Sequence, residues 1–499
     1  MERSFARLKG RMEELKDLSG VIGLCSWDQE TLLPPKAAGA RGQQLATLQG
    51  IYHERLVDPA VGDWLGEAEA EVSAEDDRAM LRVFRHERDR AVKVPPSLVR
   101  ALATAQSDGI TAWRAAREAK DFSLFRDALR RLLVLRRQQA DALGHDGERY
   151  DALLEAYEPG MRVSRLRPVI ESLREKLVPI VGKLTSGEAK WPDCFAGKQF
   201  DPEKQWPFTV RLLGDLGFDL EAGRQDKSIH PFCGGTHPND VRLTTRLFAD
   251  NVCSGIFSTI HEGGHGLYEQ GFDERHHRTP LAAAPSMGLH ESQSRMWENI
   301  IGRSRAFWSH YLPVLQSHFP EQLGDVTLDA LHKTINTVSR SLVRVEADEV
   351  TYNLHVALRF ELELLLIDDA LPLDDLPAAW NDRMEKYLGV RPPHDTLGVL
   401  QDIHWAWGEL GYFPTYTLGN LYAAQLFEAM RAELPDVEEA ISQGRLRVVR
   451  EWLREKIHRH GYRYPAETLV EKISGRGISD EAFVRYLKTK YGQISGVAL

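Results

Sequence analysis

The chain contains few cysteines, and no two of them stand at metal-binding or redox spacing. Cys25, Cys194, Cys233 and Cys253 are the only four among 499 residues, and they are scattered. This spacing excludes a zinc site built from CxxC pairs, and a disulfide framework is unexpected in so long a chain. We therefore expect a reduced protein that works in the cytoplasm.

A long hydrophobic run and an excess of positive charge are also missing. The longest aliphatic stretch, residues 362–367, ends at two aspartates and falls well short of the ~20 apolar residues that span a bilayer. The first residues lead directly into a charged helical pattern, with no apolar signal core. The formal net charge is −10, whereas nucleic acids and anionic membranes attract basic surfaces. We expect neither a nucleic acid nor a membrane as partner.

Most of the chain carries the periodicity of amphipathic helices. The spacing of apolar residues predicts helices over 2–20, 37–55, 76–92, 96–118, 121–143, 164–186, 327–367 and 421–457. Residues 190–247 are rich in proline, glycine and aromatics, and residues 241–246 within them alternate like a strand. We find no internal repeat and no linker. The predicted fold class is therefore mostly α with a small β-sheet, in a single domain over 1–499.

The segment that carries the chemistry follows this interruption and reads His261-Glu262-Gly263-Gly264-His265. On a helix, histidines at positions i and i+4 lie on one face, so both imidazoles can reach one metal ion. Each glycine costs a helix interior about 1 kcal/mol relative to alanine, which indicates that another backbone or a substrate approaches closely. An HExxH segment arises by chance in roughly one such chain in twenty, so a third ligand is needed.

A candidate third ligand is Glu291, which follows His265 by 26 positions. That separation leaves room for a loop over 279–286 and a second helix that turns Glu291 toward the histidines; the alternative is an exposed helical glutamate. Two histidines and one glutamate leave one zinc position open for water, as in catalytic sites, and Glu262 can then act as general base. Three further histidines compete as ligands. We interpret His276 and His277 as solvated loop residues, and the role of His237 stays open.

Further motifs accompany this site along the chain. They are Trp27 to Thr31 followed by Pro34, Pro35 and Arg41; His230-Pro231-Phe232; Asp240 to Thr244; His290 to Gln293; Val343 to Asp348; and Gly398 to Trp405. Together they resemble the motifs of a known family, the carboxypeptidase Taq type of thermostable metallocarboxypeptidases, from about residue 20 to the C-terminus. One departs slightly, because Val343 stands where the family has isoleucine, a small apolar change that leaves Arg344 and Asp348 in place.

The resemblance implies a mostly helical, saddle-shaped subunit with a deep groove and a small sheet next to the zinc helix, similar to neurolysin and angiotensin-converting enzyme. It implies zinc held by His261, His265 and Glu291, with cobalt as an alternative metal, and Glu262 as general base. It also implies a homodimer that releases C-terminal amino acids one at a time from peptides with a free C-terminus. Its specificity would be broad, with poor action on C-terminal proline.

A carboxypeptidase needs a group that binds the substrate's terminal carboxylate, and a guanidinium can bind both oxygens at once. Arg344 is the first candidate, with the alternative that it forms an i, i+4 ion pair with Asp348 on a helix surface. Arg242, on the predicted strand, is the second candidate, with the alternative that it is a structural partner of Asp240.

Aromatic residues near the end of the last motif are candidates for contact with the substrate. His404 can hydrogen-bond the peptide or the oxyanion, or it can be a buried histidine satisfied by Asp402. Resemblance to the tyrosine-bearing loop of related zinc peptidases makes Tyr416 the candidate donor to the oxyanion, with Tyr412 in reserve, although aromatics in such a loop often only pack. Two rival functions stay open: a related zinc endopeptidase acting on short peptides, and a non-catalytic helical protein that binds peptides.

Overall fold

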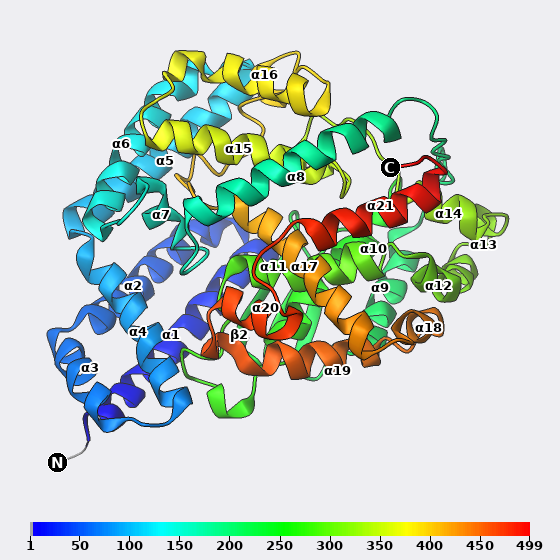
Figure 1. The fold of residues 1–499 in the computed structure, drawn as a ribbon. Coiled ribbons are helices and arrows are strands. Elements are labelled where there is room, and N and C mark those ends of the chain that lie inside the picture. The colour runs from blue at the N-terminus through cyan, green and yellow to red at the C-terminus, as the bar shows by residue number, and fades with distance from the viewer. Residues whose placement is uncertain (1–2) are drawn as a thin grey trace.

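The first predicted helical stretches form a group of four helices at the N-terminal end of the molecule. A computed structural model describes residues 3–499. The group, blue in Figure 1, comprises α1 (Ser4–Thr31), α2 (Ala38–Val57), α3 (Pro59–Glu71) and α4 (Glu75–Lys93). These helices pack on one another around a small core of their own, in which Leu8, Leu65 and Phe84 are buried. Apolar residues at helical spacing thus bury a shared face, as amphipathic helices do.

The rest of the chain is also mostly helical and surrounds one large hydrophobic core. Its helices are α5 (Pro96–Ala119), α6 (Ser123–Leu143), α7 (Arg149–Leu154), α8 (Val163–Leu184), α9 (Pro202–Leu216), α10 (Val252–Glu269), α11 (Met287–Arg295), α12 (Arg305–His318), α13 (Pro320–Leu323), α14 (Leu328–Thr334), α15 (Tyr352–Ile367), α16 (Leu376–Leu388), α17 (Pro414–Glu433), α18 (Val437–Ser442), α19 (Arg447–Lys456), α20 (Ala466–Ser474) and α21 (Glu481–Ser495). Figure 1 shows α10, α11 and α17 near the centre of the molecule.

A small sheet lies beside this centre, as the alternating pattern predicted. Its strands are β1 (Gly223–Lys227), β2 (Cys233–His237) and β3 (Asp240–Thr245), in the order β1-β3-β2. β3 is parallel to β1 and antiparallel to β2. Val241 and Leu243 of β3 are fully buried. Since β3 packs against α10, the sheet supports the helix that carries the HExxH segment.

Two predictions about secondary structure are wrong in part. The stretch 327–367 is not one helix, because residues 335–351 form a loop with a single 3-10 turn at Arg344–Glu346. In that loop the carboxylate of Asp348 accepts the backbone amides of Ser339 and Thr351, and such side-chain contacts compete with helix formation. The stretch 421–457 is divided among α17, α18 and α19.

The region 190–247 contains a helix, α9, that composition alone did not predict. Asp201 accepts the backbone amide of Glu203 at 2.9 Å, and Pro202 occupies the first helical position. Gly217 ends the helix with φ of 97°. A capping residue followed by proline, with glycine just past the end, is a helix signature that outweighs the surrounding glycine and aromatic content.

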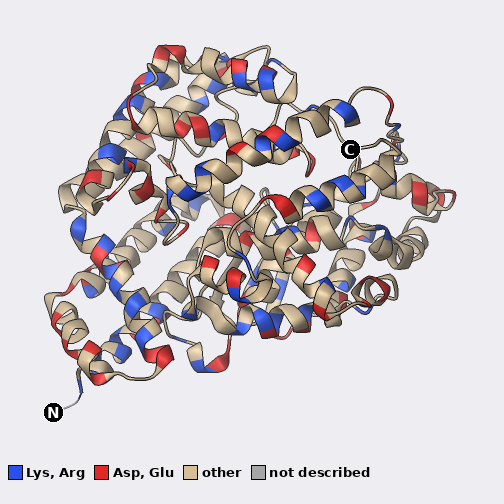
Figure 2. Cartoon of the chain, in the orientation of Figure 1, with Lys and Arg blue, Asp and Glu red and all other residues tan. Residues whose placement is uncertain are grey.

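Acidic and basic residues are interspersed along the helices (Figure 2). Within residues 3–499, no helix combines the length and the hydrophobicity that crossing a membrane requires.

Candidate metal centre and substrate cleft

Two helices that pack against each other carry the predicted ligands. α10 begins after Asn251, whose side chain accepts the backbone amide of Ser254 at 3.1 Å. α11 begins after Ser286, whose hydroxyl accepts the backbone amide of Leu289 at 3.0 Å. The helix over the HExxH segment, the loop over 279–286 and the second helix are therefore as predicted.

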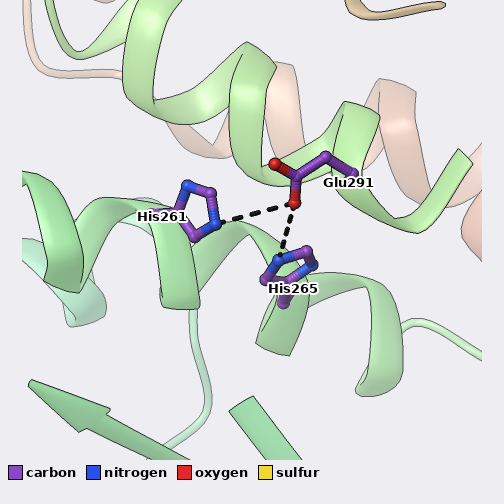
Figure 3. Close-up of side chains that lie close together, drawn as sticks. All are labelled: His261, His265 and Glu291. Atoms are coloured by element: carbon purple, nitrogen blue, oxygen red, sulfur yellow. Dashed lines mark ion pairs between the residues drawn. The ribbon is translucent and has the colours of Figure 1, made fainter. Parts of the chain in front are cut away.

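The side chains of His261, His265 and Glu291 converge on one point between these helices (Figure 3). Oε2 of Glu291 lies 3.7 Å from Nε2 of His261 and 3.4 Å from Nε2 of His265. One donor atom from each residue lies within 4.8 Å of the other two. Two imidazoles and one carboxylate so close together fit a divalent metal such as zinc and leave a coordination position open.

The glycines of the HExxH segment serve helix packing. A Cβ atom on Gly264 would lie 2.7 Å from Cα of Ser294 in α11, and one on Gly263 would lie 2.9 Å from Leu213. Across the site, a Cβ atom on Gly419 of α17 would lie 2.5 Å from Cγ of Glu291. Of the two explanations considered from the sequence, close approach of another backbone is the one observed at Gly264, because α11 must come near enough for Glu291 to meet the histidines.

Carboxylates and guanidiniums behind two of the three ligands fix their orientation. Nδ1 of His261 donates to Glu298 at 2.9 Å, which turns Nε2 toward the shared point. Arg303 donates to the other oxygen of Glu298 at 3.0 Å. Arg295 donates to Oε1 of Glu291 at 2.6 Å, so Oε2 faces the histidines. These three supporting residues were not predicted from the sequence, although Glu298 stands seven positions, about two helical turns, after Glu291.

The buried charges perturb one another strongly. Burial would raise the pKa of Glu291, but the Arg295 guanidinium and the two histidines hold that pKa well below its usual value. Burial would lower the pKa of His261, yet the carboxylates of Glu291, Glu298 and Glu262 raise it to about 9. Burial raises the pKa of Glu262 to about 7. A carboxyl group with a pKa near neutrality is suited to take up and return a proton.

His265 is held differently from His261. Its ring stacks on that of His290, with centroids 4.3 Å apart and an interplanar angle of 12°. Nε2 of His290 lies 3.0 Å from Oε1 of Glu269. Nδ1 of His265 has no hydrogen-bond partner among the described residues, so stacking rather than a carboxylate orients this ring.

Arg344 lies in a second buried cluster near the ligands, and its contacts differ from the predicted alternative. Its Nε and Nη2 donate to Oδ1 of Asp402 at 3.0 and 2.8 Å, and its Nη1 donates to the hydroxyl of Tyr352 at 2.8 Å. Arg359 donates to the other oxygen of Asp402 at 2.7 Å. Arg344 therefore pairs with Asp402 and not with Asp348, because residues 344 and 348 lie in a loop and not on one helix face.

The predicted aromatic residues gather beside Arg344. The guanidinium of Arg344 lies 4.9 Å from the ring centre of Tyr416, and Tyr412 lies 5.3 Å from Tyr416 between ring centroids. Nε2 of His404 lies 3.4 Å from the hydroxyl of Tyr416. Burial lowers the pKa of His404 to about 4. His404 stands behind the tyrosines, and neither of its nitrogens is hydrogen-bonded to Asp402.

Other candidates lie away from the ligands. Arg242 donates to Asp240 at 2.9 and 3.0 Å and its guanidinium lies 4.5 Å over the ring of Trp27, so its contacts are those of the structural alternative. His276 is buried, with 2% of its surface exposed, so its interpretation as a solvated residue is wrong. The other two histidines considered as ligands are His237 and His277. Their rings contact each other in an edge-to-face arrangement.

A cleft of about 1290 Å³ joins the two clusters. Its walls include the three ligands and Glu262, together with Arg344, Tyr352, Tyr412 and Tyr416. Neither Arg242 nor His404 reaches its surface. The expectation of a helical body with a small sheet and a deep groove is therefore confirmed.

Comparison with known proteins gives a consistent result. The family "Carboxypeptidase Taq (M32) metallopeptidase" matches residues 7–491. Thermostable carboxypeptidase 1 of Thermus thermophilus is 42% identical over 509 residues, covering 99% of each chain. Carboxypeptidase 1 of Bacillus subtilis is 35% identical over 486 residues, covering 97% of each chain. The crystal structure of the M32 carboxypeptidase from Deinococcus radiodurans R1 superimposes with a TM-score of 0.96 at 38% identity, covering 99% of this chain and 100% of that one. The chain therefore belongs to the carboxypeptidase Taq (M32) metallopeptidase family and is a metallocarboxypeptidase, a hydrolase that acts on peptide bonds.

Proposed function

We propose that this metallocarboxypeptidase holds zinc with His261, His265 and Glu291 and binds the terminal carboxylate of its substrate with Arg344. One observation carries the proposal: an unbroken series of contacts joins the two sites. Arg295 contacts Glu291, the ring of Tyr352 lies 4.6 Å from the Arg295 guanidinium, and Arg344 donates to the hydroxyl of Tyr352. A carboxylate bound at Arg344 would thus place the last peptide bond of a substrate near the metal ligands.

Glu262 is proposed as the general base and acid. A zinc ion bound by the three ligands would polarise the scissile carbonyl and lower the pKa of a coordinated water. Glu262 follows His261 directly on α10, and its side chain lines the cleft. Because burial raises its pKa to about 7, it can take a proton from the attacking water and return it to the departing amine.

Arg344 is proposed as the group that recognises a free C-terminus. Two of its five N–H groups are directed at Asp402 and one at Tyr352, which leaves two for a ligand. Arg344 and Arg359 share the single carboxylate of Asp402, so their cluster has one positive charge in excess. A substrate carboxylate would balance that charge in a buried setting, where charge-assisted hydrogen bonds are strong.

Tyr416 is proposed as the donor to the tetrahedral oxyanion, with Tyr412 in reserve. Both phenols line the cleft. Burial raises the pKa of Tyr416 well above its usual value, so its hydroxyl keeps the proton that it would donate. His404, whose ring nitrogen lies near that hydroxyl, is proposed to position Tyr416 from behind and not to contact substrate.

Several finer features follow from the motif resemblance together with the chain's chemistry. We propose a single catalytic domain over 1–499 that assembles as a homodimer, uses cobalt as an alternative metal, and works in the cytoplasm, since its four cysteines are free. Broad specificity is supported by the mixture of polar, charged and aromatic side chains along the cleft. Poor cleavage before proline is expected because that peptide bond has no N–H to donate.

The deciding experiment compares two peptides of one sequence, one with a free and one with an amidated C-terminus. Mass spectrometry should show stepwise loss of terminal residues from the free peptide and little from the amide, in the presence of zinc. Undiminished cleavage of the amide at internal bonds would instead favour the endopeptidase. Metal content of the purified protein, measured in parallel, distinguishes a failed mechanism from a missing metal.

A further inference from the structure

A second cavity lies beside the substrate cleft, between the N-terminal helices and the body. It has a volume of about 380 Å³ and is lined by residues of α1, α2 and α4 and by the loop over 279–286. Four residues line both this side cavity and the cleft: Ala156, Pro159, Ala284 and Tyr462. The side cavity is therefore continuous with the wall along which a bound peptide would lie.

Two half-buried cations face this side cavity without a carboxylate partner. Nζ of Lys16 in α1 donates to the carbonyl of Ala282 at 2.8 Å, and Arg90 in α4 donates to the carbonyl of Ala152 at 3.3 and 3.4 Å. Among the described residues, no carboxylate oxygen lies within 4.0 Å of either cation. Burial lowers the pKa of both Lys16 and Arg90, although Glu269 and Glu87 raise that of Lys16 and Glu155 raises that of Arg90 from beyond ion-pair distance.

The acidic side chains of the cavity are engaged elsewhere. The phenol of Tyr52 donates to Glu87. Glu155 pairs with Arg162 and accepts the backbone amide of Gly160 at 3.1 Å. Neither carboxylate thus compensates the two cations at close range. An anion that entered the cavity would remove the cost of holding these charges unpaired.

The walls around the cations are apolar. Met12, Leu15, Val83 and Phe84 are buried and line the cavity together with the ring of Tyr462. An apolar wall that ends at an ammonium and a guanidinium matches a side chain with a methylene stem and a carboxylate tip. A glutamate side chain has this chemistry.

We propose that the side cavity is a subsite for an acidic side chain of the substrate, upstream of the scissile bond, with Lys16 and Arg90 as its specificity-determining residues. The inference rests on the proposed function, in which the C-terminus is held at Arg344 and the preceding residues extend along the cleft. Residues upstream of the scissile bond then pass the four residues shared with the side cavity. The enzyme accordingly favours peptides with glutamate at one upstream position.

The test uses the full-length, zinc-loaded enzyme and pairs of peptides that differ only by Glu or Gln, scanned one upstream position at a time. At one position, the kcat/KM of the wild type should be about tenfold higher for the Glu peptide than for the Gln peptide. This factor corresponds to the free energy of one charge-assisted hydrogen bond in a half-buried setting. Lys16→Met and Arg90→Gln should each bring the Glu-to-Gln ratio toward one. Lys16→Arg should retain the preference. Lys9→Met, an exposed change on the same helix, should leave the ratio as in the wild type.

Three results would overturn the subsite. The first is a Glu-to-Gln ratio of kcat/KM near one at every position in the wild type. The second is an equal loss of kcat/KM on the Glu and Gln peptides in Lys16→Met, which would indicate a structural role. The third is inhibition by free glutarate that requires Lys16 without any Glu preference in peptides, because the cavity would then hold a free carboxylate. Failure to cleave any peptide would refute the proposed function instead. Melting temperature and metal content confirm that each variant is folded.

Discussion

Two buried clusters of charge face the same cleft, and they are opposite in balance. In the metal cluster, the carboxylates of Glu262, Glu291 and Glu298 outnumber the guanidiniums of Arg295 and Arg303. In the anchor cluster, Arg344 and Arg359 share the one carboxylate of Asp402. The excess of acid suits a divalent cation, and the excess of base suits a carboxylate anion.

The difference also shows how each cluster keeps its charges ionised. Burial favours the neutral form of a carboxyl group, but two guanidiniums hold the pKa of Asp402 far below its usual value. In the metal cluster, the hydrogen bond from His261 and the charge of Arg303 lower the pKa of Glu298 to about 2 against the effect of burial. In the anchor cluster one guanidinium charge is left uncompensated until a ligand arrives. In the metal cluster a protonated His261 offsets the excess of carboxylates, and metal binding requires that His261 lose this proton.

The largest expected loss of activity comes from replacing Glu262, the carboxylate of the metal cluster that is not a proposed metal ligand. Glu262→Gln should lower kcat by about 10²- to 10⁴-fold, because the amide cannot take the proton of the attacking water. Zinc content should stay at one per chain, since the three ligands are intact. Steady-state kinetics and metal analysis of the same preparation provide the check. Unchanged turnover would show that the metal cluster acts without this base.

The next effect separates the anchor cluster from the metal cluster. Arg344→Gln should reduce kcat/KM by roughly 10²-fold on a peptide with a free C-terminus, since a buried charge partner of the substrate is lost. The amidated peptide should be affected much less, because it has no carboxylate to bind. Arg242→Gln is the matched control, since Arg242 pairs with Asp240 outside the cleft. A larger loss in Arg242→Gln would make that residue the carboxylate-binding group.

A smaller effect is expected from the residue that orients the first ligand. Glu298→Gln should weaken zinc affinity about 10- to 100-fold, because His261 loses the carboxylate that fixes its ring. Competition with a chelator measures this change, and excess zinc should restore most of the activity. Glu361→Gln is a matched control, because Glu361 is a half-buried glutamate that pairs with Arg174 and Arg383 and does not line the cleft. Equal losses in both variants would argue against a specific role for Glu298.

The two clusters also differ in how far the sequence predicts them. The metal ligands come from two neighbouring helices, and the spacing of His261, His265 and Glu291 is a local pattern that a helix converts into geometry. The anchor cluster joins residues 344, 359 and 402 from separate segments, so its pairing depends on tertiary packing. The sequence indicated Arg344 as a candidate, but the alternative of an ion pair with Asp348 assumed a helix where a loop forms.

Packing also decided features that local pattern left open. The glycines of the HExxH segment indicated close approach, but only the position of α11 shows that its backbone is what comes near Gly264. His276 looked solvated because it follows a turn, yet the turn folds inward and buries it. Mostly helical structure and the strand over 240–245 were predictable, because each depends on periodicity within the segment itself.

The smallest expected effect concerns stability at the start of the helix that carries Glu291. Glu158 is fully buried and accepts the backbone amide of Gly288. Burial raises its pKa to about 8, well above the value near 4.5 of an unfolded chain. Between these two values the folded state binds more protons than the unfolded state, so this group makes stability fall as pH rises from about 5 to 8. Below that window its contribution is constant, and above it the loss is complete.

Glu158→Gln removes this titration while keeping the shape of the side chain. The variant should melt close to the wild type at pH 5 and a few degrees higher than it at pH 8, so its melting temperature depends less on pH. Glu171→Gln, an exposed change on α8, should follow the wild-type curve. Differential scanning calorimetry across this range measures both. If Glu158→Gln followed the wild-type curve as well, Glu158 would already be ionised in the folded protein, and the N-terminus of α11 would then hold an anion rather than a neutral acid.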